Sequence, residues 1–334
     1  MTAATTTPTE EHVMRDCLSR ITSDVFDSTS PIRDVQRTRS RYSSFYGSDV
    51  LTIGLADGTE FRVFLKDFGS HQRVKEGLKG RREREVGVYR DLLPSAGLRT
   101  AHYYGSHLDD ASGRFWLFLE YVPGIPVAHK PFEYWVAAAG WLGRKDAHFV
   151  GRIGRLESCD LLMRHDADYF LSTAEKALQT SRQVSPDFGR LMDSLMARYP
   201  RAVEAVVSSP HKTLVHGTYR PIQIVLDDRE EPPRLCPVDW EKAALGSCFF
   251  DLAFLADGFD PPRLAQLFGA YRAEAERGGL PLCGPDEMTY LVDCHRLHRV
   301  FNWVAVCLER GFPAEKIAKL RGMAEQVGRV VLGG

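Results

Sequence analysis

The feature of this sequence that most restricts its fold is a change of pattern at Pro123-Gly124. Before this point, short apolar segments alternate with turn residues, which is typical of strands. After it, apolar residues recur mainly at helical spacing. Strands followed by helices predict an α+β fold, with a small sheet-containing lobe and a larger, mostly helical lobe.

Five strands are expected in the first part. They are predicted at residues 33–44, 50–55, 60–66, 100–106 and 115–122, with a charged helix at about 74–93. Turns are predicted at 46–49 and 56–59, and a helix is expected to begin after Thr9, whose side chain can cap it. On the third strand Lys66 alternates with Leu65 and therefore lies on the opposite face.

The second part is expected to be helical. Helices are predicted at 131–142, 167–181, 188–207, 262–277, 286–310 and 314–330. Residues 1–8 are expected to form a disordered tail, residues 9–122 the first lobe and residues 123–334 the helical lobe.

Composition narrows the class of protein. The net charge of -1 gives no electrostatic attraction to nucleic acid or to an anionic membrane. No apolar run reaches a membrane-spanning length, and the polar start lacks a secretory pattern, so a cytoplasmic location is expected. The seven cysteines are scattered, which argues against a zinc site or a disulfide framework. His295 and His298 share a helix face without a visible third ligand, so packing is favoured there.

Two segments in the helical part read as one split active site. The first is His216-Gly217-Thr218-Tyr219-Arg220-Pro221-Ile222-Gln223-Ile224. The second is Val238-Asp239-Trp240-Glu241, followed by Gly246 and Asp251. Their spacing resembles the catalytic and metal-binding loops of the aminoglycoside phosphotransferase and choline kinase-like family. Members usually have His-Gly-Asp, four residues and Asn, whereas Thr218 and Gln223 hold the Asp and Asn positions here.

The resemblance implies a bilobal, protein kinase-like fold with a five-stranded antiparallel sheet, and the use of ATP and Mg²⁺. It assigns Asp239 as a Mg²⁺ ligand, with Gln223 at the position of the second ligand. It also implies that Asp251 accepts hydrogen bonds from the His216–Gly217 backbone; an N-cap of the following helix is the alternative role.

The same resemblance assigns nucleotide-binding residues in the first lobe. Lys66 would contact phosphates and pair with Glu85, and Glu83 is the competing partner. Glu120, Tyr121 and Val122 would form the hinge that meets the adenine edge. The phosphate-covering loop would include Ser44 and Gly47, although no glycine-rich consensus is present.

The catalytic loop is altered. His216, Thr218 and Arg220 are the candidate catalytic residues, yet a threonine hydroxyl is no base near neutral pH. Arg220 could stabilise the transferring phosphoryl group or bind an anionic substrate; a surface arginine is the plain alternative. Asp227 and Asp228 are expected to lie too far away to replace the base.

Three functions follow from this pattern. The first is transfer of the ATP γ-phosphoryl group to a hydroxyl of a small molecule, as in antibiotic modification. The second is a pseudokinase that binds nucleotide or a partner without catalysis. The third is phosphorylation of peptide Ser/Thr side chains in natural-product biosynthesis, alone or beside a partner enzyme. The acceptor is expected near four residues of the helical lobe: Tyr134, Trp135, Arg299 and Trp303.

Overall fold

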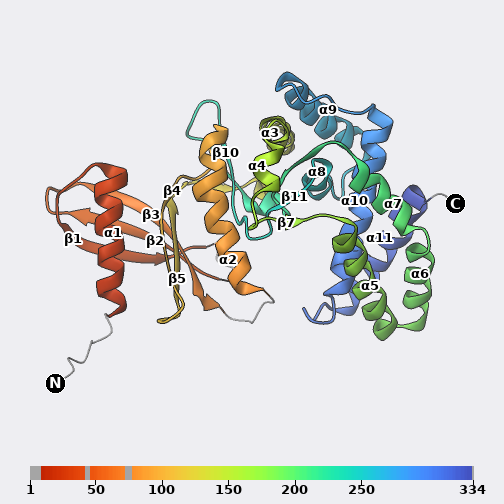
Figure 1. The fold of residues 1–334 in the computed structure, drawn as a ribbon, viewed down its shortest axis with the longest axis horizontal. Coiled ribbons are helices and arrows are strands. Elements are labelled where there is room, and N and C mark those ends of the chain that lie inside the picture. Colours follow the sequence, from red (N-terminus) through yellow and green to blue (C-terminus); the bar gives the residue numbers. More distant parts are fainter. Residues whose placement is uncertain (1–8, 42–45, 72–76, 333–334) are drawn as a thin grey trace. The chain divides into compact units, whose positions relative to one another are not determined.

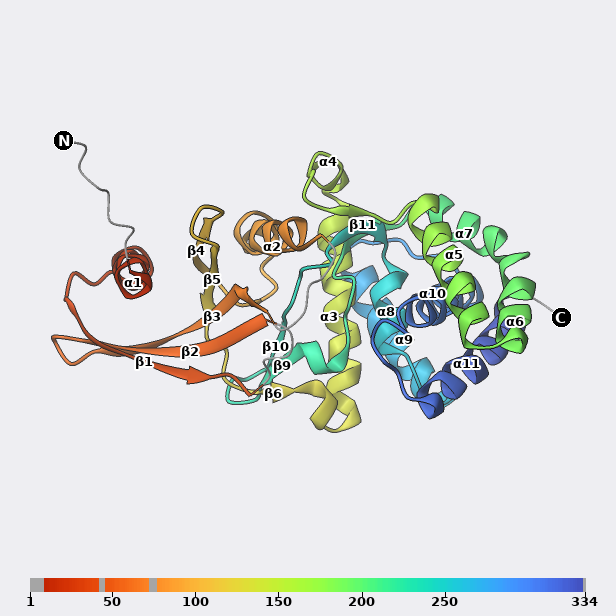
Figure 2. The ribbon, with the colours of Figure 1, turned by 90° about the horizontal axis from the view of Figure 1, so that it is seen from below.

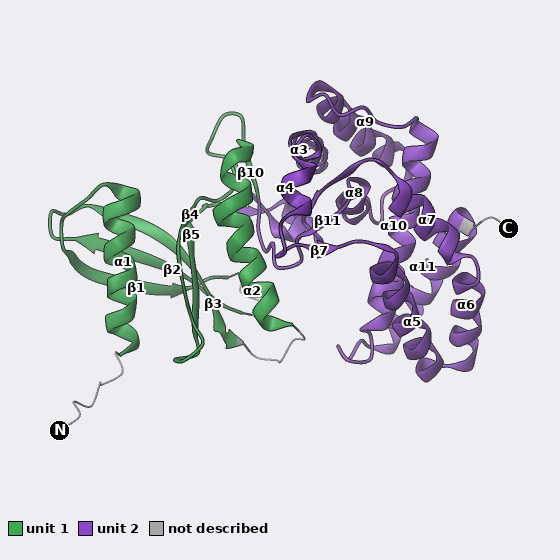
Figure 3. Cartoon of the chain, in the orientation of Figure 1, with its two compact units in different colours: residues 1–124, 227–236 green, residues 125–226, 237–334 purple. Residues whose placement is uncertain are grey.

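The computed structural model of this chain describes residues 9–41, 46–71 and 77–332. The chain divides into two compact units (Figure 3). Unit 1 comprises residues 1–124 together with 227–236, and unit 2 comprises residues 125–226 and 237–334. The short segment 227–236 thus packs with the strand-rich unit, whereas the sequence analysis assigned it to the helical lobe. The expected tail at 1–8 and Ser44 lie outside the described residues.

Unit 1 is built on a five-stranded antiparallel sheet with the order β1-β2-β3-β5-β4 (Figure 1). The strands are β1 (Ile32–Arg39), β2 (Tyr46–Leu55), β3 (Glu60–His71), β4 (Tyr103–Asp109) and β5 (Arg114–Glu120). The α+β class and the five-stranded sheet expected from the sequence are confirmed.

Helix α1 (Glu10–Phe26) covers one face of this sheet (Figure 2). It begins where the sequence predicts, since the side chain of Thr9 accepts a hydrogen bond from the N–H of His12. Cys17, Leu18 and Ile21 of the helix are buried. They pack against the apolar residues of the sheet that share this face: Leu51, Ile53, Leu55, Val63, Leu65, Trp116 and Phe118. This core fixes which face of β3 carries Leu65 and which carries Lys66.

The other face of β3 receives α2 (Leu78–Gly87). A π-helical turn (Val88–Leu92) and a 3-10 turn (Leu93–Ala96) continue α2. This run matches the later part of the charged helix expected at about 74–93, whose start lies partly outside the described residues.

Unit 2 is mostly helical. Its helices are α3 (Phe132–Val150), α4 (Ile153–Glu157), α5 (Ala167–Val184), α6 (Pro186–Met196), α7 (Tyr199–Ser208), α8 (Phe249–Leu255), α9 (Pro261–Arg277), α10 (Pro285–Ala305) and α11 (Ala314–Leu332). Helix α3 packs along α9, and α10 packs against α5, α8 and α11. A Cβ at Gly143 of α3 would lie 2.3 Å from the carbonyl oxygen of Tyr271 on α9, so the close approach of these helices requires a glycine.

Short strands carry the two loops singled out in the sequence. β8 (Lys212–Val215) pairs antiparallel with β11 (Ala244–Ser247), which pairs parallel with β7 (Met163–Arg164). β6 (Ile125–Pro126) pairs antiparallel with β9 (Ile224–Asp227), and β10 (Arg234–Pro237) follows β9 in the chain. One loop follows β8 directly and the other follows β10, so both start at a strand end.

Two local predictions are wrong. Residues 46–49 form the start of β2 instead of a turn, because Gly47 and Ser48 pair with Asp67 and Lys66 of β3. The helix expected at 188–207 is split into α6 and α7. Pro200 lies in the first turn of α7, where its missing N–H loses no helical hydrogen bond.

Within the described ranges, no helix is long and apolar enough to cross a membrane. All seven cysteines are free thiols, and most are buried.

Candidate active site

Lys66 and Glu85 form a buried ion pair in unit 1. The Nζ atom of Lys66 lies 2.6 Å from Oε2 and 2.9 Å from Oε1 of Glu85. Lys66 is 7% exposed and Glu85 is 1% exposed. The rings of Tyr46 and Phe68 face the ammonium group, with centroids 5.2 and 5.3 Å from Nζ. The pairing expected from the sequence is confirmed with Glu85 as the partner, since Glu83 instead lies 3.9 Å from the exposed Lys79.

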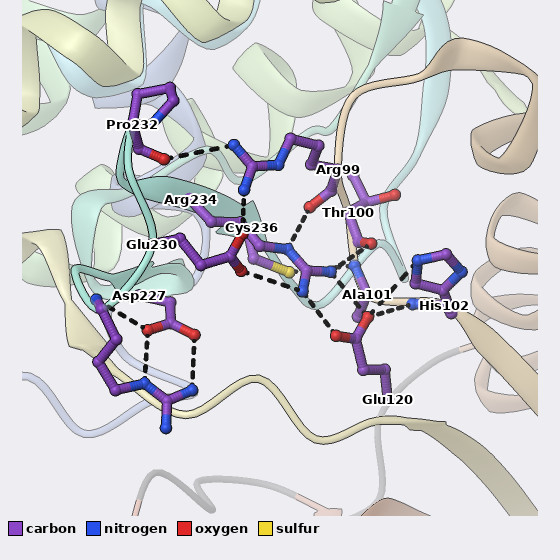
Figure 4. Close-up of polar contacts among 11 residues, drawn as sticks. Arg99, Thr100, Ala101, His102, Glu120, Asp227, Glu230, Pro232, Arg234 and Cys236 are labelled. Carbon is purple, nitrogen blue, oxygen red and sulfur yellow. Dashed lines mark hydrogen bonds and ion pairs between the residues drawn. The ribbon is translucent and has the colours of Figure 1, made fainter. Parts of the chain in front are cut away.

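The side chain of Glu120, at the end of β5, is held by an arginine (Figure 4). Arg234 donates from Nη1 to Oε1 at 2.6 Å and from Nη2 to Oε2 at 2.7 Å. Arg234 also donates to the carbonyl oxygens of Arg99 and Thr100. The carboxylate of Glu120 therefore serves this network, so a contact of Glu120 itself with a nucleotide would fall to its backbone groups.

The other residues predicted to contact the nucleotide each have their own local surroundings. Tyr121 lies beneath the guanidinium of Arg62, whose Cζ is 4.9 Å from the ring centroid. Gly47 lies within β2, and a Cβ there would be 3.1 Å from Ser70. Gly47 thus belongs to a strand that packs closely on β3, and not to a loop. Its role toward phosphates, like those of Tyr121 and Val122, stays a prediction.

In unit 2, Asp251 braces the loop that follows β8. Its Oδ2 accepts a hydrogen bond from the His216 N–H at 2.7 Å, and its Oδ1 accepts one from the Gly217 N–H at 3.0 Å. This is the bracing role expected from the sequence. The alternative role as N-cap is wrong, because Asp251 lies within α8 and Cys248 holds the N-cap position. Gly217 has a φ of 83°, and a Cβ would lie 2.3 Å from the carbonyl oxygen of Lys242, so only glycine fits there.

The ring of His216 joins the two loops. Its Nδ1 accepts a hydrogen bond from the Thr218 N–H at 3.3 Å, so its Nε2 carries the proton and donates to the carbonyl oxygen of Val238 at 3.0 Å. Burial lowers the pKa of His216, which keeps the ring neutral. Both ring nitrogens serve the backbone of the loops, and His216 therefore positions Val238 and Thr218.

Thr218, which the sequence analysis places at the position of a catalytic carboxylate, has a buried hydroxyl. Among the described residues the Oγ1 atom of Thr218 has no hydrogen-bond partner. The peptide around it is fixed, because its carbonyl oxygen accepts the Arg220 N–H at 2.6 Å. The backbone at Thr218 is therefore held by a hydrogen bond, whereas its hydroxyl has no partner in the part of the chain that the structure describes.

Arg220, Gln223 and Asp239 form a chain of side-chain hydrogen bonds. Nε of Arg220 donates to Oε1 of Gln223 at 3.3 Å, and Nε2 of Gln223 donates to Oδ2 of Asp239 at 2.6 Å. Asp239 has a φ of 72°, an unusual value for a residue other than glycine. The sequence analysis correctly placed these three residues in one site. Their arrangement differs from the predicted pair of metal ligands, Gln223 and Asp239.

This donor set does not fit a Mg²⁺ ion as it stands. Mg²⁺ takes hard oxygen ligands, but Gln223 presents its N–H group to Asp239 and turns its oxygen to Arg220. The guanidinium of Arg220, hydrogen-bonded to Gln223, adds a positive charge beside the same site. Across the described part of the chain, no group of three or more His, Cys, Asp or Glu side chains is arranged to hold a metal ion. The Mg²⁺ expectation for Gln223 and Asp239 therefore has no support in this geometry.

A buried lysine on α3 completes the brace, and the sequence analysis missed it. The Nζ of Lys145 donates to the carbonyl oxygen of Leu214 at 2.6 Å and to Oδ2 of Asp251 at 3.0 Å, and it lies 2.9 Å from Asp146. The hydroxyl of Tyr271 donates to Asp146. Burial raises the pKa of Asp146 to about 6, against the attraction of Lys145. Three consecutive charged residues, Arg144, Lys145 and Asp146, within a largely apolar helix were the signal that could have revealed this network.

The residues predicted to surround the acceptor have partners within unit 2. Trp135 packs edge-on against Phe259, with ring centroids 5.0 Å apart. Arg299 is buried and pairs with Asp257 at 3.1 Å. Trp303 packs on Phe312 of the segment before α11. Their proposed contact with an acceptor stays a prediction.

A five-stranded antiparallel sheet with a buried lysine–glutamate pair, followed by a helical unit with a carboxylate-braced His-Gly loop, defines the protein kinase-like fold of small-molecule kinases. The family model described as the phosphotransferase enzyme family matches residues 52–284. The chain belongs to this family.

Solved structures share the fold at low sequence identity. A putative aminoglycoside phosphotransferase from Ralstonia eutropha JMP134 is 16% identical with a TM-score of 0.64, covering 95% of this chain and 97% of that one. The microcompartment-associated aminopropanol kinase is 12% identical with a TM-score of 0.62, covering 96% of each chain. Spectinomycin phosphotransferase in complex with ADP and spectinomycin is 10% identical with a TM-score of 0.55, covering 91% and 94%. Comparison with curated proteins found no match.

Proposed function

We propose that this chain transfers the γ-phosphoryl group of ATP to a hydroxyl group of a small molecule or of a peptide Ser/Thr side chain. The observation that carries the proposal is the buried pair of Lys66 and Glu85. A lysine fixed in this way supplies a positioned charge for nucleotide phosphates. The ADP bound by the spectinomycin phosphotransferase supports an adenine nucleotide.

The altered loop limits how this chain could catalyse phosphoryl transfer, because Thr218 provides no general base. In the reaction, the bond from the γ-phosphorus to the bridging oxygen breaks, a bond to the acceptor oxygen forms, and the acceptor proton leaves. Thr218 cannot take that proton near neutral pH, so water would receive it. General-base help is worth about 10²–10⁴-fold, whereas most catalysis of phosphoryl transfer comes from positioning and electrostatics. A slow transferase is therefore consistent with this loop.

The names of the similar solved structures support a class of acceptor. The similar solved structures include kinases of aminopropanol and of spectinomycin, and a putative aminoglycoside phosphotransferase. These titles favour a small hydroxyl-bearing molecule, as in antibiotic modification. A peptide Ser/Thr side chain, as in natural-product biosynthesis, is the other acceptor of the same chemistry.

A second candidate is nucleotide binding without transfer. The observation that favours it is the buried Oγ1 of Thr218, which has no hydrogen-bond partner in the described part of the chain. A side chain that takes part in proton transfer would be expected to have a hydrogen-bond partner or to point toward one. In this case the chain would be a pseudokinase that retains the braced loop for binding a nucleotide or a partner.

Transfer from γ-labelled ATP tests both candidates. The full chain is incubated with panels of amino alcohols, aminoglycosides and Ser/Thr peptides, with Mg²⁺ and with a chelator. A labelled acceptor supports the transferase. ATP binding without any labelled product, with turnover gained in Thr218→Asp, supports the pseudokinase. The absence of ATP binding would overturn both.

A further inference from the structure

The hydrogen-bond chain from Arg220 through Gln223 to Asp239 links a positive charge to a negative one. The amide of Gln223 is the link, with contacts of 3.3 Å on the Arg220 side and 2.6 Å on the Asp239 side. The reverse orientation of the amide would set its oxygen against the Asp239 carboxylate and its N–H groups against the guanidinium. Charge therefore fixes the orientation of this side chain.

The backbone holds the three residues in place. The Gln223 N–H donates to the carbonyl oxygen of Arg220 at 2.7 Å, and the Val238 N–H donates to the carbonyl oxygen of Gln223 at 2.9 Å. These bonds connect the Arg220 turn directly to the residue before Asp239. The side-chain contacts thus rest on a hydrogen-bonded frame within unit 2 and do not depend on a flexible loop.

The charges at this site are partly removed from water. Arg220 and Asp239 are both half-buried, and burial lowers the pKa of Arg220 although the negative charge of Asp239 acts in the opposite direction. Two opposite charges attract each other more strongly in a partly buried site than in bulk water. A second cation at Asp239 would meet the repulsion of Arg220.

We propose that Arg220 is a built-in counter-cation for Asp239, so that these loops bind a divalent cation poorly on their own. A divalent ion bound by both Asp239 and Gln223 would require the amide to rotate, which breaks both of its hydrogen bonds. The ion would also face an uncompensated guanidinium. The inference concerns the cation affinity of the loops and stands whether or not the chain transfers phosphoryl groups.

Binding of Mn²⁺ to the full chain, followed by electron paramagnetic resonance without nucleotide or acceptor, tests this proposal. The wild type is expected to bind Mn²⁺ no more tightly than Asp239→Asn. Arg220→Ala is expected to bind at least about tenfold more tightly than the wild type, because it removes the positive charge that repels a cation approaching Asp239. The double variant with Asp239→Asn should lose that gain.

Arg190→Ala is the matched control. It removes one arginine from an exposed pair with Asp187 in unit 2 and should leave Mn²⁺ binding unchanged. Wild-type binding that Asp239→Asn abolishes would overturn the proposal, and this comparison does not require Arg220→Ala to fold. Equal affinity of the wild type and a folded Arg220→Ala would also overturn it.

Discussion

The ammonium of Lys66 and the carboxylate of Glu85 meet at 2.6 Å on the face of the sheet opposite the α1 core. β3 supplies one partner and α2 the other, so the pair ties the helix to the sheet. Because both side chains are buried, removal of either one takes a close counter-charge away from the other in a site shielded from water.

Substitution of Lys66 tests this pair. Lys66→Met is expected to lower the free energy of unfolding by about 3–5 kcal/mol, because the buried carboxylate of Glu85 would lose the ammonium group that contacts both of its oxygens. Lys79→Ala is the control, since Lys79 pairs with Glu83 at an exposed site and should cost about 0–1 kcal/mol. Urea unfolding of the full chain measures both. Equal stability of the two variants would show that the buried pair is absent.

The buried hydroxyl of Thr218 gives a second prediction. Thr218→Val removes a hydroxyl that has no partner among the described residues, so the free energy of unfolding should stay the same or rise. Thr22→Val is the control: its buried hydroxyl donates to the carbonyl oxygen of Leu18 at 2.8 Å, and the loss should be about 1 kcal/mol. A similar loss in Thr218→Val would mean that its hydroxyl is hydrogen-bonded in solution.

Replacement of Arg234, which contacts Glu120, by lysine is predicted to lower the free energy of unfolding even though the positive charge is kept. Arg234→Lys loses the two-pronged contact with Glu120 and the bonds to two carbonyl oxygens, and should cost about 1–3 kcal/mol. Arg229→Lys also loses a two-pronged contact, with Asp227, but Arg229 is exposed to water and, among the described residues, bonds no carbonyl oxygens in this way, so it should cost less, about 0–1 kcal/mol. Thermal and urea unfolding compare the two. Arg234→Lys behaving like Arg229→Lys would argue against the network.

Three buried histidines in unit 2 predict a loss of stability in acid. Burial lowers the pKa of His295 to about 3, and it lowers the pKa of His165 and His298, with the neighbouring histidines adding to the effect. The unfolded chain therefore binds more protons than the folded chain below pH 6.5. The contribution of each neutral histidine to the free energy of unfolding is fully present above that pH and is lost as the pH drops toward 3. At pH 5.5 the loss is about 1.4 kcal/mol per histidine.

Unfolding at pH 7.5 and pH 5.5 measures this dependence. His295→Leu should reduce the acid-induced loss by about 1.4 kcal/mol, since it removes one of the titrating groups. His12→Leu, at an exposed site paired with Asp16, is the control and should leave the loss unchanged. An unaltered loss in His295→Leu would mean that His295 does not titrate as the structure implies.

Much of the fold was predictable because it follows from local patterns. Alternation placed Lys66 opposite Leu65, and Thr9 marked the start of α1. Residues 46–49 were predicted as a turn because turn-forming residues outweighed pairing partners that lie far along the chain. The break between α6 and α7 was missed although Pro200 signals it.

The site was predictable in part because its two loops resemble those of a known family. That resemblance implied the contact of Asp251 with the His216–Gly217 backbone and placed Gln223 near Asp239. The direction of the Gln223 amide was not predictable, because it depends on the charges of Arg220 and Asp239 in three dimensions. Lys145 was missed because its partners come from a carbonyl oxygen of β8 and a carboxylate of α8, which no local pattern connects.

Calorimetric titration of the full chain with ATP tests the central claim most directly. The account predicts that the wild type and Lys79→Ala bind ATP with equal affinity, and that a folded Lys66→Arg binds at least about tenfold more weakly, because its planar fork replaces a point charge held by Glu85. No binding by the wild type, or equal binding by Lys66→Arg, would contradict it.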